Sequence, residues 1–250
     1  MPPRCEIIGV EGLGEVRPGD SVADLIVQSA ARQRTPLESG DVVVIGQKII
    51  SKAEGRLVRL GDVIPSTVAR TMAARLGRDP RLVEVILLES SRVVRMDKSI
   101  LVVETHHGWI CANAGVDQSN VDHDTVALLP EDPDRSARQV RDRILTAHRA
   151  DVSVIIADTF GRPWREGLTN VAIGVAGLAA LRTYVGQTDP AGHLLQATVI
   201  AVADELASAA ELVMGKLDRI PVAIVRGLGL AQSEEGSTPL RRDPARDLFR

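Results

Sequence analysis

The order of apolar and polar positions along the chain predicts strands and helices in irregular alternation. Short apolar runs with the length of strands occur at 41–45, 100–103, 152–157, 197–203 and 221–226. Apolar residues three and four positions apart predict helices at 22–30, 66–76, 134–149 and from Asp204 to Leu217. Ser21 and Gly77 occupy positions typical of a helix start and a helix end. Because the order follows no simple strand–helix repeat, we expect a mixed sheet.

The run at 152–157 is apolar or small at every position, which is typical of a strand buried on both faces. It gives way to Asp158 and Thr159, so we expect these side chains at the exposed carboxyl end of the strand. Ligands bind at such strand ends in open α/β sheets, and carboxylate and hydroxyl oxygens suit a hard cation. Arg162 and Arg165 follow in a glycine-bearing turn, within reach of a phosphate carried by that cation.

A second acidic turn, 115–124, follows the apolar segment 109–114. It supplies four side chains with oxygen donors: Asp117, Asn120, Asp122 and Asp124. The spacing does not match an EF-hand, because the loop glycine and the distal glutamate are missing. For this turn alone, carboxylates that bond only to local backbone donors are an equal alternative. Two acidic turns in one chain favour a shared Mg²⁺ or Mn²⁺ site, because Mg²⁺ is usually held by one or two carboxylates plus substrate phosphates.

Composition excludes several classes of protein. The 250 residues include 44% hydrophobic and 25% charged residues, a balance typical of globular proteins. A net charge of −3, with two Trp, one Tyr and two Phe, argues against nucleic-acid binding. The longest apolar run, 171–181, contains two glycines and is shorter than the roughly 20 residues of a membrane-spanning helix. With no secretory signal visible, we expect a cytoplasmic protein without membrane contact.

Common nucleotide and hydrolase motifs are missing from the sequence. It contains no Walker A motif and no G-x-S-x-G elbow. Gly12-Leu13-Gly14 is not followed by glycine at the dinucleotide-binding position, which Arg17 occupies. If the chain binds a nucleotide, it uses another arrangement of residues.

Several blocks, in order, resemble the coenzyme F-420-0:L-glutamate ligase family, including the N-terminal domain of its bifunctional actinobacterial-type members. These blocks are Gly12–Glu15, IISKAEGRL at 49–57, NAGVDQSNV at 113–121, ADTFGR at 157–162, VADE at 202–205 and Met214-Gly215. NAGVDQSNV and DTFGR are the most specific. The resemblance implies a catalytic domain over 1–230, followed by a polar tail or linker over 231–250. This end resembles the junction that leads to a nitroreductase-like domain in bifunctional members.

The resemblance also implies a fold, an activity and partners. The fold is α+β, with mixed sheets, flanking helices and an intertwined homodimer. The activity is GTP-dependent addition of L-glutamate to F-420-0, often followed by further γ-linked glutamates. Two divalent cations, Mg²⁺ or Mn²⁺, are implied, sometimes with K⁺.

Site residues follow from the matching motifs. Asp117 and Asp158 match ligands of one metal ion, and Thr159 matches a ligand of the other. Matches to nucleotide contacts are Gly12, Leu13, Gly14, Glu15, Lys52, Asn120 and the loop Met214, Gly215, Lys216, Leu217, Asp218, Arg219, Ile220 and Pro221.

Two positions depart from the family pattern. Lys216 stands where archaeal members have a metal-binding glutamate, and a protonated lysine cannot ligate Mg²⁺. Either fewer protein oxygens hold the second metal ion, or the ammonium replaces part of its charge. Gln47 stands where relatives have a nucleotide-contacting serine; it keeps hydrogen-bonding capacity but has a different reach.

A carboxylate condenses with an amine only after one of its oxygens becomes a leaving group. We therefore expect the GTP γ-phosphoryl group to move to the carboxylate of F-420-0, and the glutamate amine to attack the acyl phosphate. Asp158 would act in catalysis through its metal ion, while Lys52, Arg162 and Arg165 would balance phosphate charge. The alternatives are a metal-dependent phosphohydrolase, which would turn over phosphate esters without an amine, and a regulatory module that binds GTP without chemistry.

Overall fold

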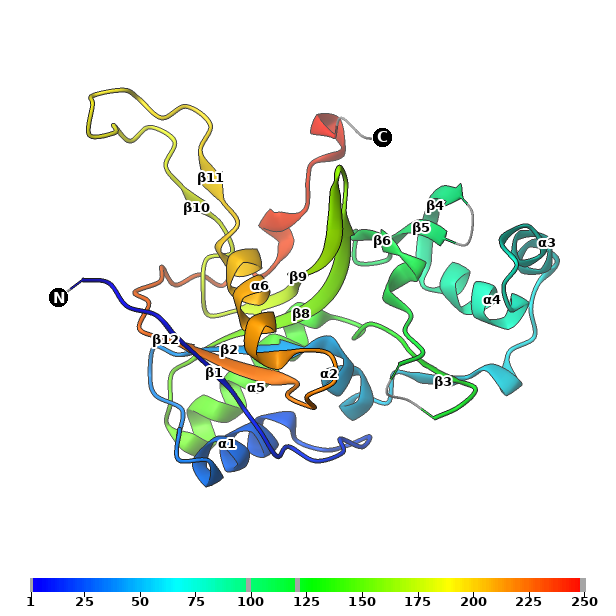
Figure 1. Ribbon diagram of the computed structural model, residues 1–250, viewed down its shortest axis with the longest axis horizontal. Coiled ribbons are helices and arrows are strands. Elements are labelled where there is room, and N and C mark those ends of the chain that lie inside the picture. Colours follow the sequence, from blue (N-terminus) through cyan, green and yellow to red (C-terminus); the bar gives the residue numbers. More distant parts are fainter. Residues whose placement is uncertain (1, 98–99, 120–121, 248–250) are drawn as a thin grey trace.

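The computed structural model describes residues 2–97, 100–119 and 122–247. Its centre is a five-stranded sheet in the order β1, β12, β2, β8, β9 (Figure 1). The bounds are β1 (Glu6–Gly9), β12 (Val222–Arg226), β2 (Val42–Gly46), β8 (Ser153–Arg162) and β9 (Arg165–Ala176). Strands β2 and β8 pair in parallel and the other neighbours are antiparallel. The predicted mixed sheet and α+β class are confirmed.

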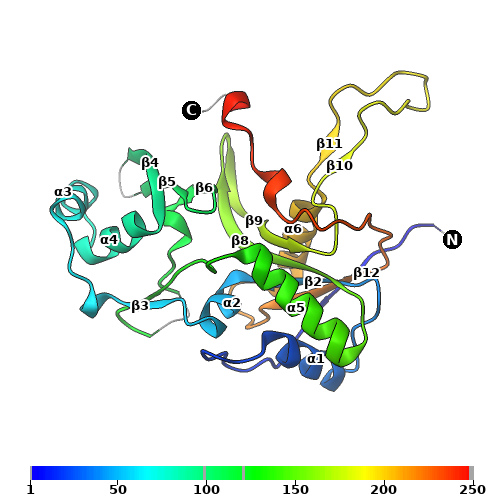
Figure 2. The same ribbon diagram turned by 180° about the vertical axis from the view of Figure 1, so that it is seen from behind.

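Helices cover both faces of this sheet because its central strands are apolar on both sides. In β8, Val154 and Ile156 face one core while Ile155 and Ala157 face the other. The first core is completed by α1 (Val22–Arg32) and α5 (Pro133–His148); α5 crosses in front of the sheet in Figure 2, and α1 lies below it. The second is completed by α6 (Val202–Met214) on the opposite face. The two-sided burial predicted for 152–157 is therefore confirmed.

A smaller lobe with its own apolar core lies beside the sheet (Figure 1). It contains α3 (Thr67–Leu76), α4 (Pro80–Leu88), β4 (Ser90–Asp97), β5 (Ile100–Thr105) and β6 (Ile110–Ala112). A two-stranded ladder of β3 (Leu57–Arg59) and β7 (Thr125–Ala127) joins this lobe to α2 (Gln47–Ala53), the helix that follows β2. Short 3₁₀ turns occur at Leu60–Asp62, Asn113–Gly115, Thr238–Leu240 and Pro244–Arg246.

Local capping sets several helix ends as the sequence predicts. The Ser21 hydroxyl accepts a hydrogen bond from the Asp24 amide at the start of α1, and Ser66 does the same for Ala69 in α3. Gly77 ends α3 with a φ of 65° in the left-handed region. The helices predicted at 22–30, 66–76 and 134–149 are therefore confirmed.

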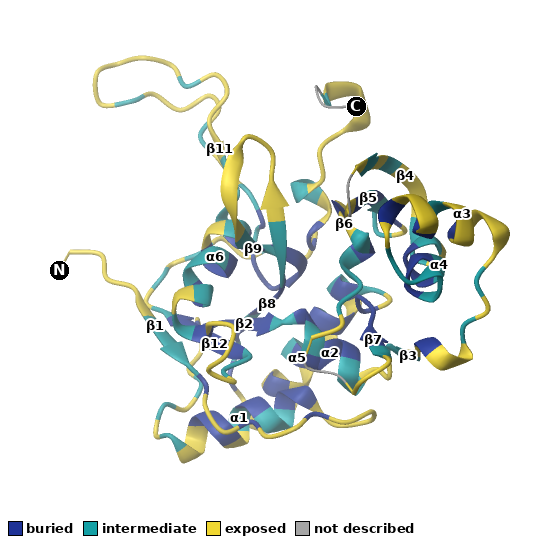
Figure 3. Cartoon of the chain, turned by 45° about the vertical axis from the view of Figure 1, so that its right-hand side comes forward, coloured by how far each residue is buried: buried dark blue, intermediate teal, exposed yellow. Residues whose placement is uncertain are grey.

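The strand predicted at 197–203 is wrong over most of its length. Only β11 (Val199–Ile200) is extended there, paired with β10 (Arg182–Thr183), and α6 already begins at Val202. The same helix ends at Met214 rather than at Leu217, because Gly215 adopts φ 60° and ψ −177°. Residues 184–198 extend beyond β10 and β11 as a long arm, mostly exposed in Figure 3.

The polar C-terminal stretch packs against the body of the protein over part of its described length. Ser237 is buried, and its amide donates to Asp134 Oδ1 at 2.9 Å. Arg241 donates to the carbonyl of His107 at 2.7 Å.

None of the helices within the described ranges has the length and apolar character needed to cross a membrane.

Candidate functional site

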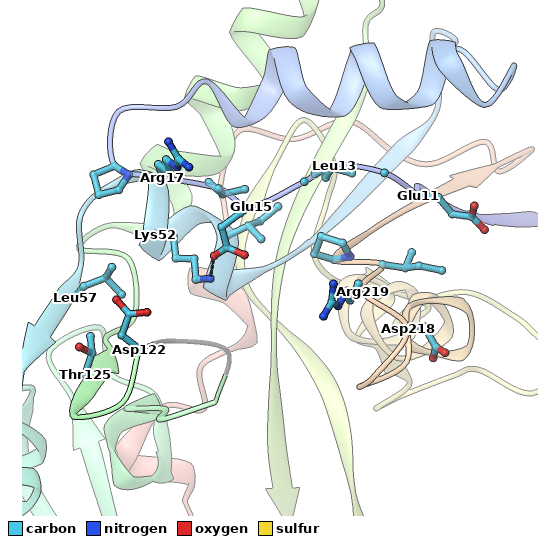
Figure 4. Close-up of a pocket in the computed structure, with 17 residues that line it drawn as sticks. Glu11, Leu13, Glu15, Arg17, Lys52, Leu57, Asp122, Thr125, Asp218 and Arg219 are labelled. Carbon is cyan, nitrogen blue, oxygen red and sulfur yellow. Dashed lines mark hydrogen bonds and ion pairs between the residues drawn. The ribbon is translucent and has the colours of Figure 1, made fainter.

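Two cavities share a common wall of four residues: Ile49, Lys52, Ile220 and Pro221. Cavity 1, of about 1020 Å³, lies between the turn 11–18, helix α2 and the loop 218–221 (Figure 4). Cavity 2, of about 680 Å³, lies over the middle of β8 and is bounded by the start of α2, the segment around Asp117 and the loop 214–217. The shared wall makes the two cavities neighbouring parts of one site.

Asp158 lines cavity 2 from within β8 rather than from its end. The strand continues to Arg162, and Asp158 pairs with Val171 of β9, so the expected strand end at 158 is wrong. Bulges on either side of this segment interrupt the ladder between Ile156 and Ala157 and between Phe160 and Arg162. They allow the strand to extend past the polar residues as a hairpin.

Burial, with a smaller contribution from the negative charge of Asp117, raises the pKa of Asp158 to about 6. The backbone amide of Thr159 and the ammonium groups of Lys48 and Lys216 act in the opposite direction. Within the described part of the chain, no ion pair to the Asp158 carboxylate is found. This carboxylate is therefore a shielded negative charge that has a backbone hydrogen bond but no ion-pair partner among the described residues.

Asp117 approaches the same cavity from the other lobe. Its backbone forms two hydrogen bonds with Ala127, of 3.0 and 2.8 Å, which hold this segment beside β7. Lys48 pairs with its carboxylate at 2.8 Å, and the Ser119 amide donates to it at 2.7 Å. Burial acts to raise the pKa of Asp117, but these partners outweigh it and the pKa lies below its usual value. Two acidic turns 41 positions apart thus meet in one cavity.

These two carboxylates fit a single hard cation. The charge on Asp117 raises the pKa of Asp158, so a cation between them would relieve repulsion between two like charges. No cluster of three or more acidic, histidine or cysteine side chains that could hold a metal ion occurs in residues 2–97, 100–119 and 122–247. The arrangement matches Mg²⁺ sites that use one or two carboxylates and leave the remaining positions to water or phosphate.

Thr159 belongs to a closed ring of hydrogen bonds beside Asp158. Its hydroxyl donates to Asn170 Oδ1 at 2.7 Å and accepts from Lys216 Nζ at 2.7 Å. Asn170 Nδ2 donates to Glu211 Oε2 at 2.8 Å, and Lys216 pairs with Glu211 Oε1 at 3.0 Å. Each of the four side chains is therefore bonded to two others.

The turn predicted to contact nucleotide borders cavity 1. Gly12 and Gly14 have φ values of 70° and 75°, and a Cβ atom at either would meet no atom within 4 Å. The backbone here is open to a ligand that approaches closely. Glu15 forms an ion pair with Lys52 across the cavity (Figure 4). Lys52 thus reaches cavity 1 while also lining cavity 2.

The loop Met214–Pro221 borders both cavities, with 214–217 in cavity 2 and 218–221 in cavity 1. Gln47 also lines cavity 2, where its Oε1 accepts a hydrogen bond of 2.7 Å from Ser51. The structure therefore brings together most of the residues predicted from sequence. Asn120 lies outside the described residues.

Comparison with known proteins shows the family of the chain. The model of the F420-0:gamma-glutamyl ligase family matches residues 12–227. The chain belongs to this family. It is similar to the coenzyme F420:L-glutamate ligase of Methanothermobacter thermautotrophicus, with 46% identity over 98% of both chains. The enzyme of the same name from Methanopyrus kandleri is 48% identical over 94% of both chains. The one from Methanocaldococcus jannaschii is 40% identical over 99% of this chain and 97% of its own.

Two residues expected in this ligase-family site lie elsewhere. Arg162 and Arg165 are exposed at the tip of the β8–β9 hairpin and line neither cavity. Arg162 donates to the carbonyl of Glu166 at 3.2 Å. Because β8 continues past Asp158, the turn that carries both arginines begins four residues further on than the sequence indicates.

Lys48, Asn170 and Glu211 line the site although the sequence reasoning gave them no role. Lys48 and Lys52 are one helical turn apart, and side chains at that spacing share one helix face, so this pair carried a usable signal. Asn170 and Glu211 enter the site through β9 and α6. Only the sheet topology places those elements beside β8, and no local pattern indicated them.

Proposed function

We propose that this protein is a GTP-dependent ligase that adds L-glutamate to coenzyme F-420-0, and then further γ-linked glutamates, with release of GDP and phosphate. The convergence of Asp117 and Asp158 beside two adjoining cavities carries this proposal. Relatives named coenzyme F420:L-glutamate ligase match nearly the whole chain. The proposed substrate is taken from the names of these relatives. The proposed reaction route is argued from the arrangement of the site.

Cavity 1 would hold the nucleotide. The open backbone at Gly12 and Gly14 suits close approach of the ligand, and Lys52 lies where the triphosphate would pass towards cavity 2. Cavity 2 would hold the acceptor carboxylate and the incoming glutamate. Phe160, Leu168 and Leu217 give this cavity an apolar edge that suits the deazaflavin ring of F-420-0.

Catalysis would proceed through an acyl phosphate. The acceptor carboxylate attacks the γ-phosphorus of GTP, and the bond from that phosphorus to the bridging oxygen of GDP breaks. The glutamate amine then attacks the acyl carbon, loses a proton and displaces inorganic phosphate. Lys52 and Lys216 would offset phosphate charge as these bonds change. A Mg²⁺ or Mn²⁺ ion on Asp117 and Asp158 would supply further charge neutralisation when bound.

Mass analysis of the product formed from GTP, L-glutamate and F-420-0 tests this function, because the mass added also reports the number of glutamates. We expect Asp158→Asn to lower glutamate-dependent GDP release about 100-fold or more. Asp142→Asn, on the exposed face of α5, is the matched control and should leave the rate unchanged. Phosphate-ester turnover without an amine would favour a phosphohydrolase, and GTP binding without GDP formation would favour a regulatory module.

We also propose that the active form is a homodimer joined through the arm 184–198. Val185 and Leu194 on the arm are 48% and 59% exposed. Leu212 on α6 is 84% exposed. Apolar side chains on a projecting element offer area that a second chain can cover, and contiguous apolar patches mark such contact surfaces. A second copy of the chain that covers the arm would bury them.

A further inference from the structure

The hydrogen-bond ring of Thr159, Asn170, Glu211 and Lys216 fixes the position of one positive charge at this site. It places the Lys216 ammonium on the Thr159 hydroxyl, the residue next to Asp158. That hydroxyl has one donor hydrogen and two acceptor lone pairs. The donor is used by Asn170 and one lone pair by Lys216. The second lone pair is on the same oxygen, which already bonds to a cationic group.

Charges around cavity 2 leave room for one cation. Three carboxylates line it, those of Asp117, Asp158 and Glu211. Lys48 pairs with Asp117 and Lys216 with Glu211, while the remaining lysine in the lining, Lys52, pairs with Glu15. Asp158 is left with its charge uncompensated by an ion pair among the described residues. One divalent ion would neutralise this carboxylate and retain positive charge for phosphate.

We propose that this protein uses one divalent cation per site, on Asp117 and Asp158, and that the Lys216 ammonium takes the place of a second cation. The inference rests on the proposed function, because it assigns the charges that meet the GTP phosphates.

A second ion on Thr159 does not fit the arrangement of the ring. Mg²⁺ binds oxygen at about 2.0–2.1 Å, so an ion on this hydroxyl would share its oxygen with an ammonium 2.7 Å away. Two cations on one oxygen are close enough to repel each other, which disfavours the second ion. Glu211, the other carboxylate within reach of Thr159, already bonds to Lys216 and Asn170.

Lys216 is suited to contact phosphate directly. An ammonium has three donor hydrogens, and Thr159 and Glu211 use two of them. The Lys216 side chain is 59% exposed, so the third hydrogen is open to the cavity. The ring fixes the position of the charge, and the free hydrogen can bond to a phosphate oxygen.

The test counts Mn²⁺ ions bound per chain, with the loss of the free-ion signal in electron paramagnetic resonance as readout. The probe is Mn²⁺ with guanosine 5′-(β,γ-imido)triphosphate at the protein concentration. We expect one ion per chain for the unmodified protein and two for Lys216→Glu, which replaces the ammonium by an oxygen ligand. Arg75→Glu, an equal change of charge on the exposed side of α3, should stay at one.

Lys216→Met keeps the length of the side chain without its charge, and it separates loss of charge from misfolding. We expect about tenfold weaker binding of the triphosphate analogue with a smaller effect on GDP. Two ions in the unmodified protein, one ion in a folded Lys216→Glu, or unchanged analogue binding by Lys216→Met would each overturn the inference. Failure of the unmodified protein to bind the analogue would instead count against the proposed function.

Discussion

Asp117 and Asp158 share a cavity, yet their surroundings shift their pKa values in opposite directions. Lys48 and the Ser119 amide hold the pKa of Asp117 below its usual value despite burial. Burial and the charge of Asp117 raise the pKa of Asp158 to about 6. Two residues of one type therefore differ because only one has a direct cationic partner. The local neighbours of each carboxylate determine what it can do at this site.

Cys111 lies in the same cavity but should be chemically inert. It is 7% exposed, and burial together with the nearby Asp158 charge raises the pKa of its thiol to about 12. Because the thiolate is the reactive form, we expect iodoacetamide at neutral pH to alkylate exposed Cys5 and leave Cys111 unmodified. Peptide mass spectrometry measures both sites in one sample. Unfolded protein, in which both should react, is the control; equal labelling in folded protein would contradict the prediction.

At the scale of elements, an ion pair joins the end of β12 to the start of β2. Arg226 donates to both carboxylate oxygens of Asp41 at 2.8 Å and to Glu38 at 2.7 Å. Asp41 is only 1% exposed, so its charge depends on this partner. The arrangement secures two neighbouring strands of the sheet that positions Asp158.

Removing Arg226 should therefore destabilise the whole protein. We expect Arg226→Ala to lower the free energy of unfolding by about 3 kcal/mol, the lower end for a broken buried pair, because the Arg226 side chain is 23% exposed. Urea denaturation followed by circular dichroism gives this value. Arg135→Ala, which breaks the exposed pair with Glu131, should cost less than about 1 kcal/mol. Similar losses in the two variants would refute the argument from burial.

Helices α1 and α5 are linked by Asp24, which pairs with Arg143 at 2.9 Å and lies 3.2 Å from His148. The hydrogen bonds from Arg143 hold the pKa of this carboxyl well below its usual range. A group whose pKa is lower in the folded state stabilises the fold fully above its unfolded pKa, about 3.9, and loses this contribution as the pH falls towards the folded pKa.

The stability difference between the unmodified protein and Asp24→Asn should therefore depend on pH. We expect it to be largest near about pH 7 and to shrink below about pH 4. Urea denaturation at several pH values measures it. Asp62→Asn is the control, since Asp62 is 74% exposed and 4.0 Å from Arg59, and it should show little difference at any pH. A gap for Asp24→Asn that stays constant with pH would argue against this pairing.

At the scale of the whole molecule, continuous apolar runs and local caps carried most of the information available in the sequence. Strands β2, β8 and β12 are apolar at nearly every buried position, so their burial on two faces was predictable. The extent of β11 was not, because Val199 and Ile200 are extended only where β10 lies beside them. Likewise, β8 continues past Asp158 because β9 pairs with it. In both cases the neighbouring strand determines where the strand ends, and the local sequence pattern does not reveal that neighbour.

The site residues also divide into those that a local pattern indicates and those that a tertiary contact places. The sequence indicated two oxygen-rich turns, and their convergence was expected chiefly from resemblance to a family. The contacts that place positive charge beside these turns join residues far apart in sequence. Lys48 and Asp117 are 69 positions apart, and Lys216 and Thr159 are 57 positions apart. Arg162 and Arg165 were expected beside the phosphate by proximity along the chain, but the hairpin carries them away.

The arm 184–198 offers a test of assembly that leaves the site intact. Its described backbone hydrogen bonds join its own two sides, as between Gly186 and Leu195 at 2.9 Å. Thr183 pairs with Val199, so an Asn-Gly turn can connect them in place of the arm. If the arm supplies the dimer contacts, as we propose, light scattering should give about twice the chain mass of 26.8 kDa for the full chain and the single mass for the shortened one.

Melting temperature is the control in that experiment, and it should change little because the arm contributes little to the cores of the body. Leu194→Ser, a single change at an exposed arm position, should weaken association without removing the arm. If light scattering still gave the dimer mass for the shortened chain, the dimer would form through another surface. A full chain that is monomeric at all concentrations would rule out the dimer itself, while leaving the pairing of Asp117 with Asp158 within one subunit unaffected.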